Sequence, residues 1–210
     1  MTNSVKPIYY YPNNMGRIIL LGMEEILGQN GLKAVLNQAN LSYLINNYPP
    51  NNLDLLFEFE NLSKIQVALE ELYGPNGGRG LALRTGRACF KYGLREFGPI
   101  LGLTDKTFRL LPINEKLDTG LNIFADCFTN YSDQRVRVDQ DEDRYYWIIE
   151  RCPICWDRHT DNTACHLAVG TLEEALFWLS GGKHYRVEET NCLARGDLTC
   201  TIMINKHPIE

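Results

Sequence analysis

The sequence predicts an α+β fold, in which N-terminal helices pack on a four-stranded antiparallel sheet with one inserted helix. Helical periodicity dominates residues 1–133. Hydrophobic residues then alternate with polar ones from about residue 134, and a single helical stretch interrupts the four strands that this alternation predicts. Helices grouped before strands are typical of α+β proteins. We predict a single domain over residues 1–210, with a mainly helical part (1–133) and a metal-stapled α+β part (134–205).

The N-terminal half contains three amphipathic segments. The first predicted helix, Met15–Gln29, ends at Asn30-Gly31, and Leu32–Leu44 forms the second. Paired prolines and asparagines make residues 46–52 a loop. The clearest amphipathic helix is Asn61–Tyr73, which has apolar residues on one face and glutamates on the other.

A glycine-rich segment, Gly74–Gly80, follows this helix. It is neither preceded by a strand nor followed by Lys-Ser/Thr, so it does not fit a phosphate-binding loop and is predicted to join two helices. The next helix, Leu81–Phe97, contains the small residues Ala82, Gly86 and Gly93, which would let a ligand or a second helix approach closely.

The remaining helices and strands are predicted from the spacing of apolar residues, which changes between helical periodicity and alternation. The sequence predicts, in order, a helix at Asn114–Tyr131, strands around Val136–Val138 and Tyr145–Ile149, a helix at Ala164–Ser180, and strands at His184–Glu189 and Leu198–Ile204. Gly181-Gly182 ends the inserted helix.

Composition and charge exclude several classes of partner. The chain is 44% hydrophobic and 22% charged, as in ordinary globular proteins, and its net charge of −5 gives no basic surface for nucleic acid or anionic membranes. No apolar run is long enough to span a bilayer, and Met1–Asn14 lacks the pattern of a signal peptide. We therefore expect a cytoplasmic protein, in which seven cysteines are more suited to metal binding than to disulfides.

Four side chains that could bind a metal ion lie close together at one end of the sheet if the strands pair as predicted. Cys165 lies at the head of the inserted helix on its apolar face, and Cys200 shares the inward face of the last strand with Leu198. Glu189 points inward at the end of the preceding strand, beside Cys192. Structural zinc takes four tetrahedral nitrogen, sulfur or oxygen ligands, so Cys165, Glu189, Cys192 and Cys200 form a candidate zinc site.

Alternatives to this ligand set remain open. Cys165 and Cys200 would also suit a core as small apolar residues. The pair Cys152 and Cys155 is a C-x-x-C half-site that could supply rival ligands, and it lacks the βαβ context of a thiol-exchange motif. Cys89 and Cys127 lie on apolar helix faces and are predicted to belong to the core.

The segment Glu189–Cys200, with the pattern E-x-x-C-x-A-x-G-D-x-x-C, resembles the 4-vinyl-reductase-type domain, also called the hydrocarbon-binding domain. Cys165-His166 and Gly170 precede it as in that family. The likeness extends upstream and covers most of the 210 residues, through the segments Gly28-x-x-Gly31-Leu32, Leu72-Tyr73-Gly74 and Arg84-x-Gly86-Arg87.

This resemblance implies a fold similar to the ligand-binding domains of nitric-oxide signalling and Golgi transport proteins, commonly dimeric and with a hydrophobic pocket. In the family's aromatic-responsive sensors, a zinc is held at positions that match Cys165, Glu189, Cys192 and Cys200. The spacing before the first of these differs by about one residue, which keeps Cys155 as a rival. Candidate pocket residues, each of which could also be ordinary core, are Phe90, Phe97, Phe124, Phe128, Trp147 and Trp178.

Three functions follow as hypotheses. The first is a zinc-stabilised homodimeric module that binds or senses a small hydrophobic or aromatic molecule, a tetrapyrrole being one candidate. Because the chain ends at Glu210 without an ATPase or DNA-binding segment, such a sensor would signal through a separate partner. The second is an enzyme or accessory protein for reduction of a vinyl group in (bacterio)chlorophyll biosynthesis, although the sequence contains no nicotinamide or flavin fingerprint. The third is a purely structural assembly partner.

Overall fold

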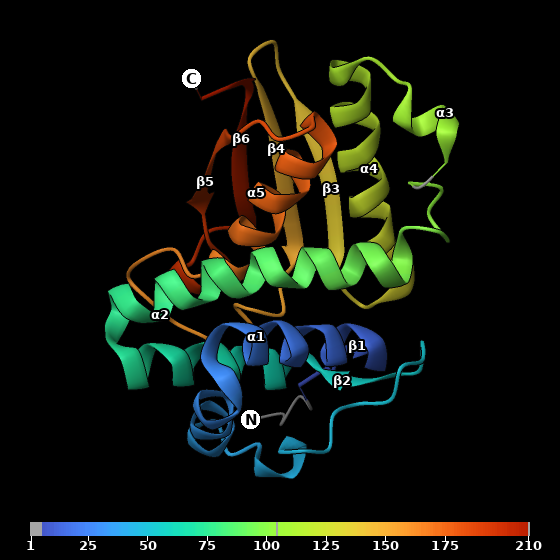
Figure 1. The fold of residues 1–210 in the computed structure, drawn as a ribbon. Coiled ribbons are helices and arrows are strands. Elements are labelled where there is room, and N and C mark those ends of the chain that lie inside the picture. Colours follow the sequence, from blue (N-terminus) through green and yellow to red (C-terminus); the bar gives the residue numbers. More distant parts are fainter. Residues whose placement is uncertain (1–5, 104, 210) are drawn as a thin grey trace.

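A computed structural model of the protein describes residues 6–103 and 105–209, so the first five residues of the segment searched for a signal peptide lie outside it. Figure 1 shows α5 on one face of the main sheet, with α4 beside it and α1 on the far side of α2. The elements are β1 (Tyr10–Pro12), α1 (Asn13–Gln38), η1 (Ser42–Leu44), β2 (Leu55–Glu58), α2 (Phe59–Phe97), α3 (Lys106–Arg109), α4 (Ile113–Tyr131), β3 (Arg135–Gln140), β4 (Arg144–Arg151), α5 (His166–Ser180), β5 (Tyr185–Asn191), η2 (Leu193–Arg195) and β6 (Cys200–Pro208).

The main sheet confirms the predicted fold class. Its four strands are antiparallel in the order β3-β4-β6-β5, and α5 is inserted between β4 and β5. In the register, Trp147 lies opposite both Val138 and Ile202, and Glu189 also lies opposite Ile202. The inward residues of the central strands therefore form a continuous buried surface beneath α5, and Glu189 joins it at one end.

Both long helices are kinked at a glycine. In α1 the kink is at Gly28, where φ is 69°, and in α2 it is at Gly74, where φ is 72°. The left-handed region is open to glycine at little cost, which explains why the chain turns there. The predicted break at Asn30-Gly31 was therefore placed too late, and the second helix ends at Gln38 instead of Leu44. The predicted helix junction is confirmed at Gly74, but residues 75–80 are helical, so the helix expected to begin at Leu81 begins earlier.

The chain also forms a two-stranded sheet that the hydrophobic pattern did not predict. Strand β1 pairs antiparallel with β2, with Tyr11 opposite Phe57. Asp133 fixes this sheet to the end of α4, since its backbone N–H donates to Tyr10 O at 3.0 Å and its Oδ2 accepts from Tyr10 N at 2.8 Å. The N-terminal segment is thereby held against the start of β3.

Two glycines allow α2 and α5 to cross at close range. A Cβ atom added at Gly86 would collide with the backbone carbonyl of Leu167, and one added at Gly170 would collide with that of Leu83. The expectation that Gly86 admits a second helix is confirmed. Gly93, by contrast, has nothing within 4 Å of an added Cβ. The close crossing brings the start of α5, and with it Cys165, over the end of the sheet.

None of the helices among the described residues is both long and apolar enough to cross a bilayer.

Candidate metal centre and apolar cavity

Five cysteines and one glutamate meet where the loop after β4, the head of α5 and the turn between β5 and β6 come together. Cys165 is the N-cap residue of α5, and Cys192 and Cys200 flank the turn. Cys152 and Cys155, considered as rival ligands, lie in the same cluster, and all five thiols are buried. The structure thus brings every predicted metal-binding candidate to one place.

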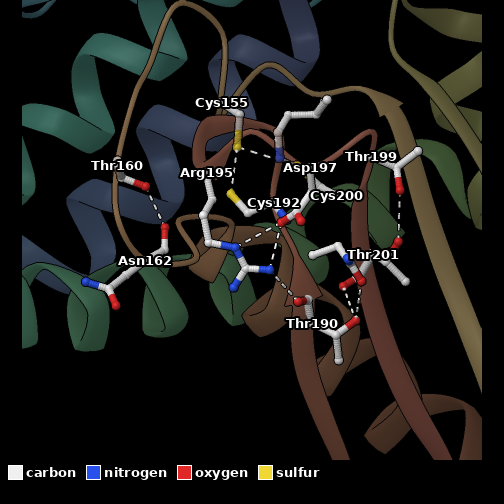
Figure 2. Close-up of polar contacts among 12 residues, drawn as sticks. Cys155, Thr160, Asn162, Thr190, Cys192, Arg195, Asp197, Thr199, Cys200 and Thr201 are labelled. Atoms are coloured by element: carbon white, nitrogen blue, oxygen red, sulfur yellow. Dashed lines mark hydrogen bonds and ion pairs between the residues drawn. The ribbon is translucent and has the colours of Figure 1, made fainter.

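The sulfur of Cys155 lies at the centre of the cluster. It is 3.4 Å from the sulfurs of Cys165 and Cys192 and 3.5 Å from that of Cys200. Figure 2 shows Cys155 on the incoming loop, with Cys192 and Cys200 on the turn facing it. Four sulfurs around zinc, at Zn–S distances of about 2.3 Å, would lie about 3.8 Å apart. The observed separations therefore need only a small expansion to admit the ion.

Two overlapping groups of four side chains are compact enough to surround a metal ion. The ligand atoms of Cys165, Glu189, Cys192 and Cys200 lie within 4.8 Å of one another, and so do the sulfurs of Cys152, Cys155, Cys165 and Cys200. A buried cluster that could hold a metal ion is therefore present, and Cys165 and Cys200 belong to both sets.

Glu189 faces inward, as its strand position predicts, and is only 8% exposed. Its Oε2 accepts a hydrogen bond from the backbone N–H of Cys165 at 2.7 Å, whereas its Oε1 is buried without a hydrogen-bond partner among the described residues. Burial, together with the nearby Cys192 sulfur, raises the pKa of this carboxyl to about 8. A buried acceptor without a partner is costly, and a cation beside it would remove that cost.

The turn between β5 and β6 is built to present two sulfurs. The backbone N–H of Cys192 donates to Asp197 Oδ2 at 2.8 Å, and Arg195 pairs with the same oxygen at 2.7 Å (Figure 2). Gly196 has a φ of 98°, which allows the sharp reversal. The N–H of Leu193 donates to Cys200 Sγ at 3.3 Å, which fixes this sulfur against the turn.

Other contacts anchor the loop that brings in Cys155. Arg158 is buried and makes an ion pair with Glu70 of α2 at 2.8 Å, and Ser63 Oγ donates to Trp156 O at 2.6 Å. The backbone N–H of Thr160 donates to Ala194 O at 2.9 Å. The neighbouring thiols, that of Cys152 first, lower the pKa of Cys155 well below its usual range. The cluster thus favours a central thiolate, which is the metal-binding form of cysteine.

The prediction that Leu198 lies on the inward face of the last strand is wrong. Leu198 is 95% exposed, because β6 begins only at Cys200 and the residues before it still belong to the turn.

An apolar cavity of about 140 Å³ lies close to this cluster. Its walls come from β1, α1, α2, α4, β4 and α5, and from the segments that flank them. Ile154, between Cys152 and Cys155, and Leu167, two residues after Cys165, belong to the lining. The loop and the helix that present cysteines to the cluster therefore also form part of the cavity wall.

The structure places five of the six predicted pocket aromatics in this cavity. Its lining includes Phe90, Phe97, Phe124, Phe128 and Trp147. Trp178 instead lines a separate hollow with Phe108, and its ring stacks on that of Phe108 at 6.3 Å. Trp178 lies beyond Phe90, whose ring centroid is 6.1 Å away, and is therefore not part of the cavity wall.

Sequence reasoning missed two polar residues of the lining, Tyr11 and Gln134. Both are 5% exposed, and the Tyr11 hydroxyl donates a short hydrogen bond to Gln134 Oε1. Neither lies in a periodic apolar pattern, since Tyr11 belongs to a three-residue strand and Gln134 to the connection before β3. The run Tyr9-Tyr10-Tyr11 was the only available sign that an aromatic side chain is buried there.

Two further cysteines line the cavity, and their chemistry differs from that of the cluster. Burial raises the pKa of both Cys89 and Cys127 to about 12, so both remain protonated thiols near neutral pH. The Cys89 thiol also donates to Ile18 O at 3.8 Å. Because the thiolate is the nucleophile, these side chains act as small apolar wall residues, in keeping with their prediction as core.

We therefore expect Cys89 and Cys127 to resist alkylation by iodoacetamide in the folded protein between about pH 7 and pH 9, since their thiolate fraction stays small below a pKa of about 12. Peptide mass mapping after brief treatment measures this directly. The guanidinium-unfolded chain is the control, in which both should react. Rapid modification of either thiol in folded protein would contradict the assignment.

The comparisons with known proteins support the fold. No protein-family model matches the chain, and no curated protein matches its sequence. An H-NOX protein from S. oneidensis in the Fe(II)NO ligation state is similar in structure, with a TM-score of 0.55 and 14% identity, covering 92% of this chain and 99% of that one. A mutant H-NOX protein from K. algicida, Fe(II) unliganded, gives a TM-score of 0.57 and 13% identity over 93% and 97% of the two chains.

The phenol-responsive sensory domain of the transcription activator PoxR, solved with phenol, gives a TM-score of 0.53 and 18% identity, covering 72% of this chain and 76% of that one. At these identities the likeness concerns the fold alone. The predicted similarity to a ligand-binding domain of nitric-oxide signalling is thereby confirmed, while the resemblance to the 4-vinyl-reductase-type family stays a prediction. This chain has the fold of the H-NOX proteins and of that sensory domain.

Proposed function

We propose that this protein is a zinc-stabilised module that binds or senses a small apolar or aromatic molecule. The observation on which the proposal depends is the apolar cavity, because folded proteins rarely contain voids larger than a water molecule. Each methylene-sized void costs about 1 kcal/mol of stability, so an empty cavity of this size would be a substantial burden. The neighbouring sensory domain, solved with phenol, shows that one protein of this fold can accept a one-ring ligand.

The volume of the cavity favours a ligand with one ring. An engineered cavity of about 150 Å³ lined by Leu, Ile and Phe binds benzene, and the cavity here is of similar size, about 140 Å³. Toluene or a molecule of comparable bulk would therefore fit with little rearrangement. Phe90 and Phe124 meet edge to face at 5.5 Å, as do Phe128 and Trp147 at 6.1 Å, so a ring would find aromatic edges and faces around it.

A tetrapyrrole fits less well. Four linked pyrrole rings are several times larger than benzene, so the cavity would have to widen considerably. A haem held by a proximal histidine would also lack its axial ligand, because none of the four histidines is a lining residue. The vinyl-reductase hypothesis meets the same difficulty of size, since its substrate is a chlorophyll precursor. We therefore favour binding of a one-ring molecule over both alternatives.

Zinc is the metal that best suits the cysteine cluster. Four buried thiol ligands, with no open position, are typical of structural zinc sites. We propose Cys165, Cys192 and Cys200 as three of the ligands and Cys155 as the fourth, because the Cys155 sulfur lies within 3.5 Å of the other three sulfurs. Glu189 would then hold the Cys165 backbone through its Oε2 and position that ligand.

A larger side chain in the cavity wall should exclude the ligand. We expect Ala168→Leu, which adds bulk to the lining at α5, to weaken toluene binding about tenfold or more without lowering the melting temperature. Isothermal titration calorimetry with toluene measures the affinity. The matched control, Ala34→Leu on the exposed face of α1, should bind like the unaltered protein. Equal binding by both variants would place toluene outside the cavity.

The expected homodimer, cytoplasmic location and separate signalling partner belong to the same proposal. The H-NOX and sensory-domain folds suit a module that passes a binding signal to another protein. Sedimentation equilibrium of the purified chain distinguishes a dimer from a monomer, and a single species of monomer mass at high concentration would refute the dimer.

A further inference from the structure

We propose that Tyr11 and Gln134 form a polar subsite of the cavity, which selects apolar ligands that carry one hydrogen-bond-accepting oxygen, above all a carbonyl oxygen. This inference rests on the proposed binding function and specifies its ligand class. It starts from two buried polar side chains in the wall of a mostly apolar cavity. A buried hydroxyl and a buried amide are costly in an apolar wall unless their hydrogen-bonding groups find partners.

The hydrogen bond between Tyr11 and Gln134 uses only some of the hydrogen-bonding groups of the two side chains. The Tyr11 hydroxyl donates to Gln134 Oε1, which occupies the carbonyl side of the amide. The amide NH₂ group of Gln134 carries two further donors. Among the described residues, the hydrogen bonds made by the Gln134 side chain use its carbonyl oxygen alone. Gln134 is a lining residue of the cavity, so an acceptor atom on a ligand bound there would pair with one of these donors.

The pair is held rigidly in place, which a recognition site requires. The backbone N–H of Gln134 donates to Ser132 Oγ at 3.1 Å, and Ser132 Oγ donates to Phe128 O at 2.6 Å. Arg151 Nη1 donates to Asp133 O at 2.9 Å, so β4 also holds this connection. On the other side, the Tyr11 ring packs against Phe59 at 5.1 Å. The backbone at Gln134 and the ring of Tyr11 are thus fixed, and the hydrogen bond between the two side chains orients the amide.

Two other polar groups of the lining already donate to backbone carbonyls. The Thr171 hydroxyl donates to Leu167 O at 2.9 Å, and the Cys89 thiol donates to Ile18 O. Phe128, whose ring lies 6.4 Å from that of Tyr11, provides an aromatic surface beside the subsite. A one-ring ligand could thus place its ring against Phe128 and its oxygen at the Gln134 amide. Acetophenone has this form, and α-methylstyrene has the same shape with a methylene group in place of the oxygen.

The test compares these two probes by calorimetry with the unaltered protein and with Tyr11→Phe and Gln134→Met. Gln134→Met removes the donor, and the loss of that hydrogen bond should weaken acetophenone binding about 5–10-fold. Tyr11→Phe removes the hydroxyl that orients the amide, and it should weaken acetophenone binding as well. Both variants should leave α-methylstyrene binding unchanged within about twofold. Equal changes for both probes would show that the pair has only a structural role and would overturn the inference. If toluene binds but neither variant alters the acetophenone affinity, the subsite is wrong and the binding function stands.

Failure of toluene and both probes to bind the unaltered protein would overturn the binding function and the inference together. A second measurement needs no variant and covers the case in which the variants do not fold. In protein labelled with ¹⁵N-glutamine, the side-chain amide protons of Gln134 should shift downfield with acetophenone and not with α-methylstyrene. An unchanged Gln134 amide at saturating acetophenone would overturn the subsite.

Discussion

The Cys192→Ala variant is expected to lose its zinc and to melt at least about 10 °C below the unaltered protein. Cys192 is fully buried, and its sulfur lies 3.4 Å from that of Cys155. Structural zinc contributes about 10–16 kcal/mol of apparent binding energy in small zinc peptides, and that energy is coupled to folding. A variant with one thiolate fewer would lose much of this energy, and the turn between β5 and β6 would lose its attachment to α5.

The measurement is metal content by plasma mass spectrometry together with calorimetric melting. Cys127→Ala is the matched control, since it removes a buried thiol outside the cluster. It should keep its zinc and lose only the small packing energy of one sulfur. If Cys192→Ala retained a full complement of zinc and an unchanged melting temperature, the proposal that a zinc ion bound by Cys192 stabilises the fold would be contradicted.

A comparison of Cys155→Ala with Glu189→Gln identifies the fourth ligand in the same assay. With Cys155 as ligand, Cys155→Ala should lose zinc as Cys192→Ala does. Glu189→Gln should keep it, because the amide oxygen can still accept the hydrogen bond from Cys165 N–H. The reverse result would assign the position to Glu189, as the resemblance to the aromatic-responsive sensors implies.

The second large effect is expected at the crossing of α2 and α5. Gly86→Ala should lower the free energy of unfolding by about 3 kcal/mol or more, because the added methyl group meets the Leu167 carbonyl of the facing helix. Backbone cannot change rotamer, so the two helices must separate. For a chain of this size the melting temperature should fall by about 6–12 °C.

Gly93→Ala is the control on the same helix. An alanine Cβ there meets nothing within 4 Å, and alanine is favoured over glycine in a helix by about 0.5–1 kcal/mol. This variant should therefore be as stable as the unaltered protein or slightly more stable. Urea unfolding of the two variants, measured in parallel, checks the contrast. Equal stabilities would show that the helices do not cross at Gly86.

The sequence was sufficient to predict the elements with a long, regular period. The apolar face of Ala164–Ser180 and the alternation around Tyr145–Ile149 depend on local periodicity, and both were predicted correctly. The inward direction of Glu189 followed from the same alternation. Strands β1 and β2 were missed because they are short, and because their pairing joins segments more than forty residues apart, which no local pattern can indicate.

The remaining errors have local causes. A glycine can take a positive φ wherever the fold requires it, and the sequence did not show that Gly28 and not Gly31 would do so. Alternation counted backward from Cys200 placed Leu198 inside, although the turn after Gly196 extends to that point. The loop that contains Cys152 and Cys155 has no period at all, so its approach to the cluster became visible only with tertiary contacts, such as the Arg158–Glu70 ion pair.

The cavity could be anticipated only through the family resemblance. Phe90 and Trp178 both looked like pocket residues, yet only Phe90 reaches the cavity, because the position of α3 places Phe108 against Trp178. Tyr11 and Gln134 lie 123 residues apart in the chain, and their hydrogen bond depends on the sheet that the pattern did not predict. Such a site is a property of the packed chain and not of any segment.

The most direct test of the central claim is anomalous X-ray diffraction from one crystal of the zinc-loaded protein soaked in bromobenzene. We expect a zinc peak among the sulfurs of Cys155, Cys165, Cys192 and Cys200, and a bromine peak inside the cavity between α2, α4 and α5. A crystal that shows no metal peak at the cysteines, and bromine only on the protein surface, would contradict the proposal that a metal-stapled fold holds a small apolar molecule.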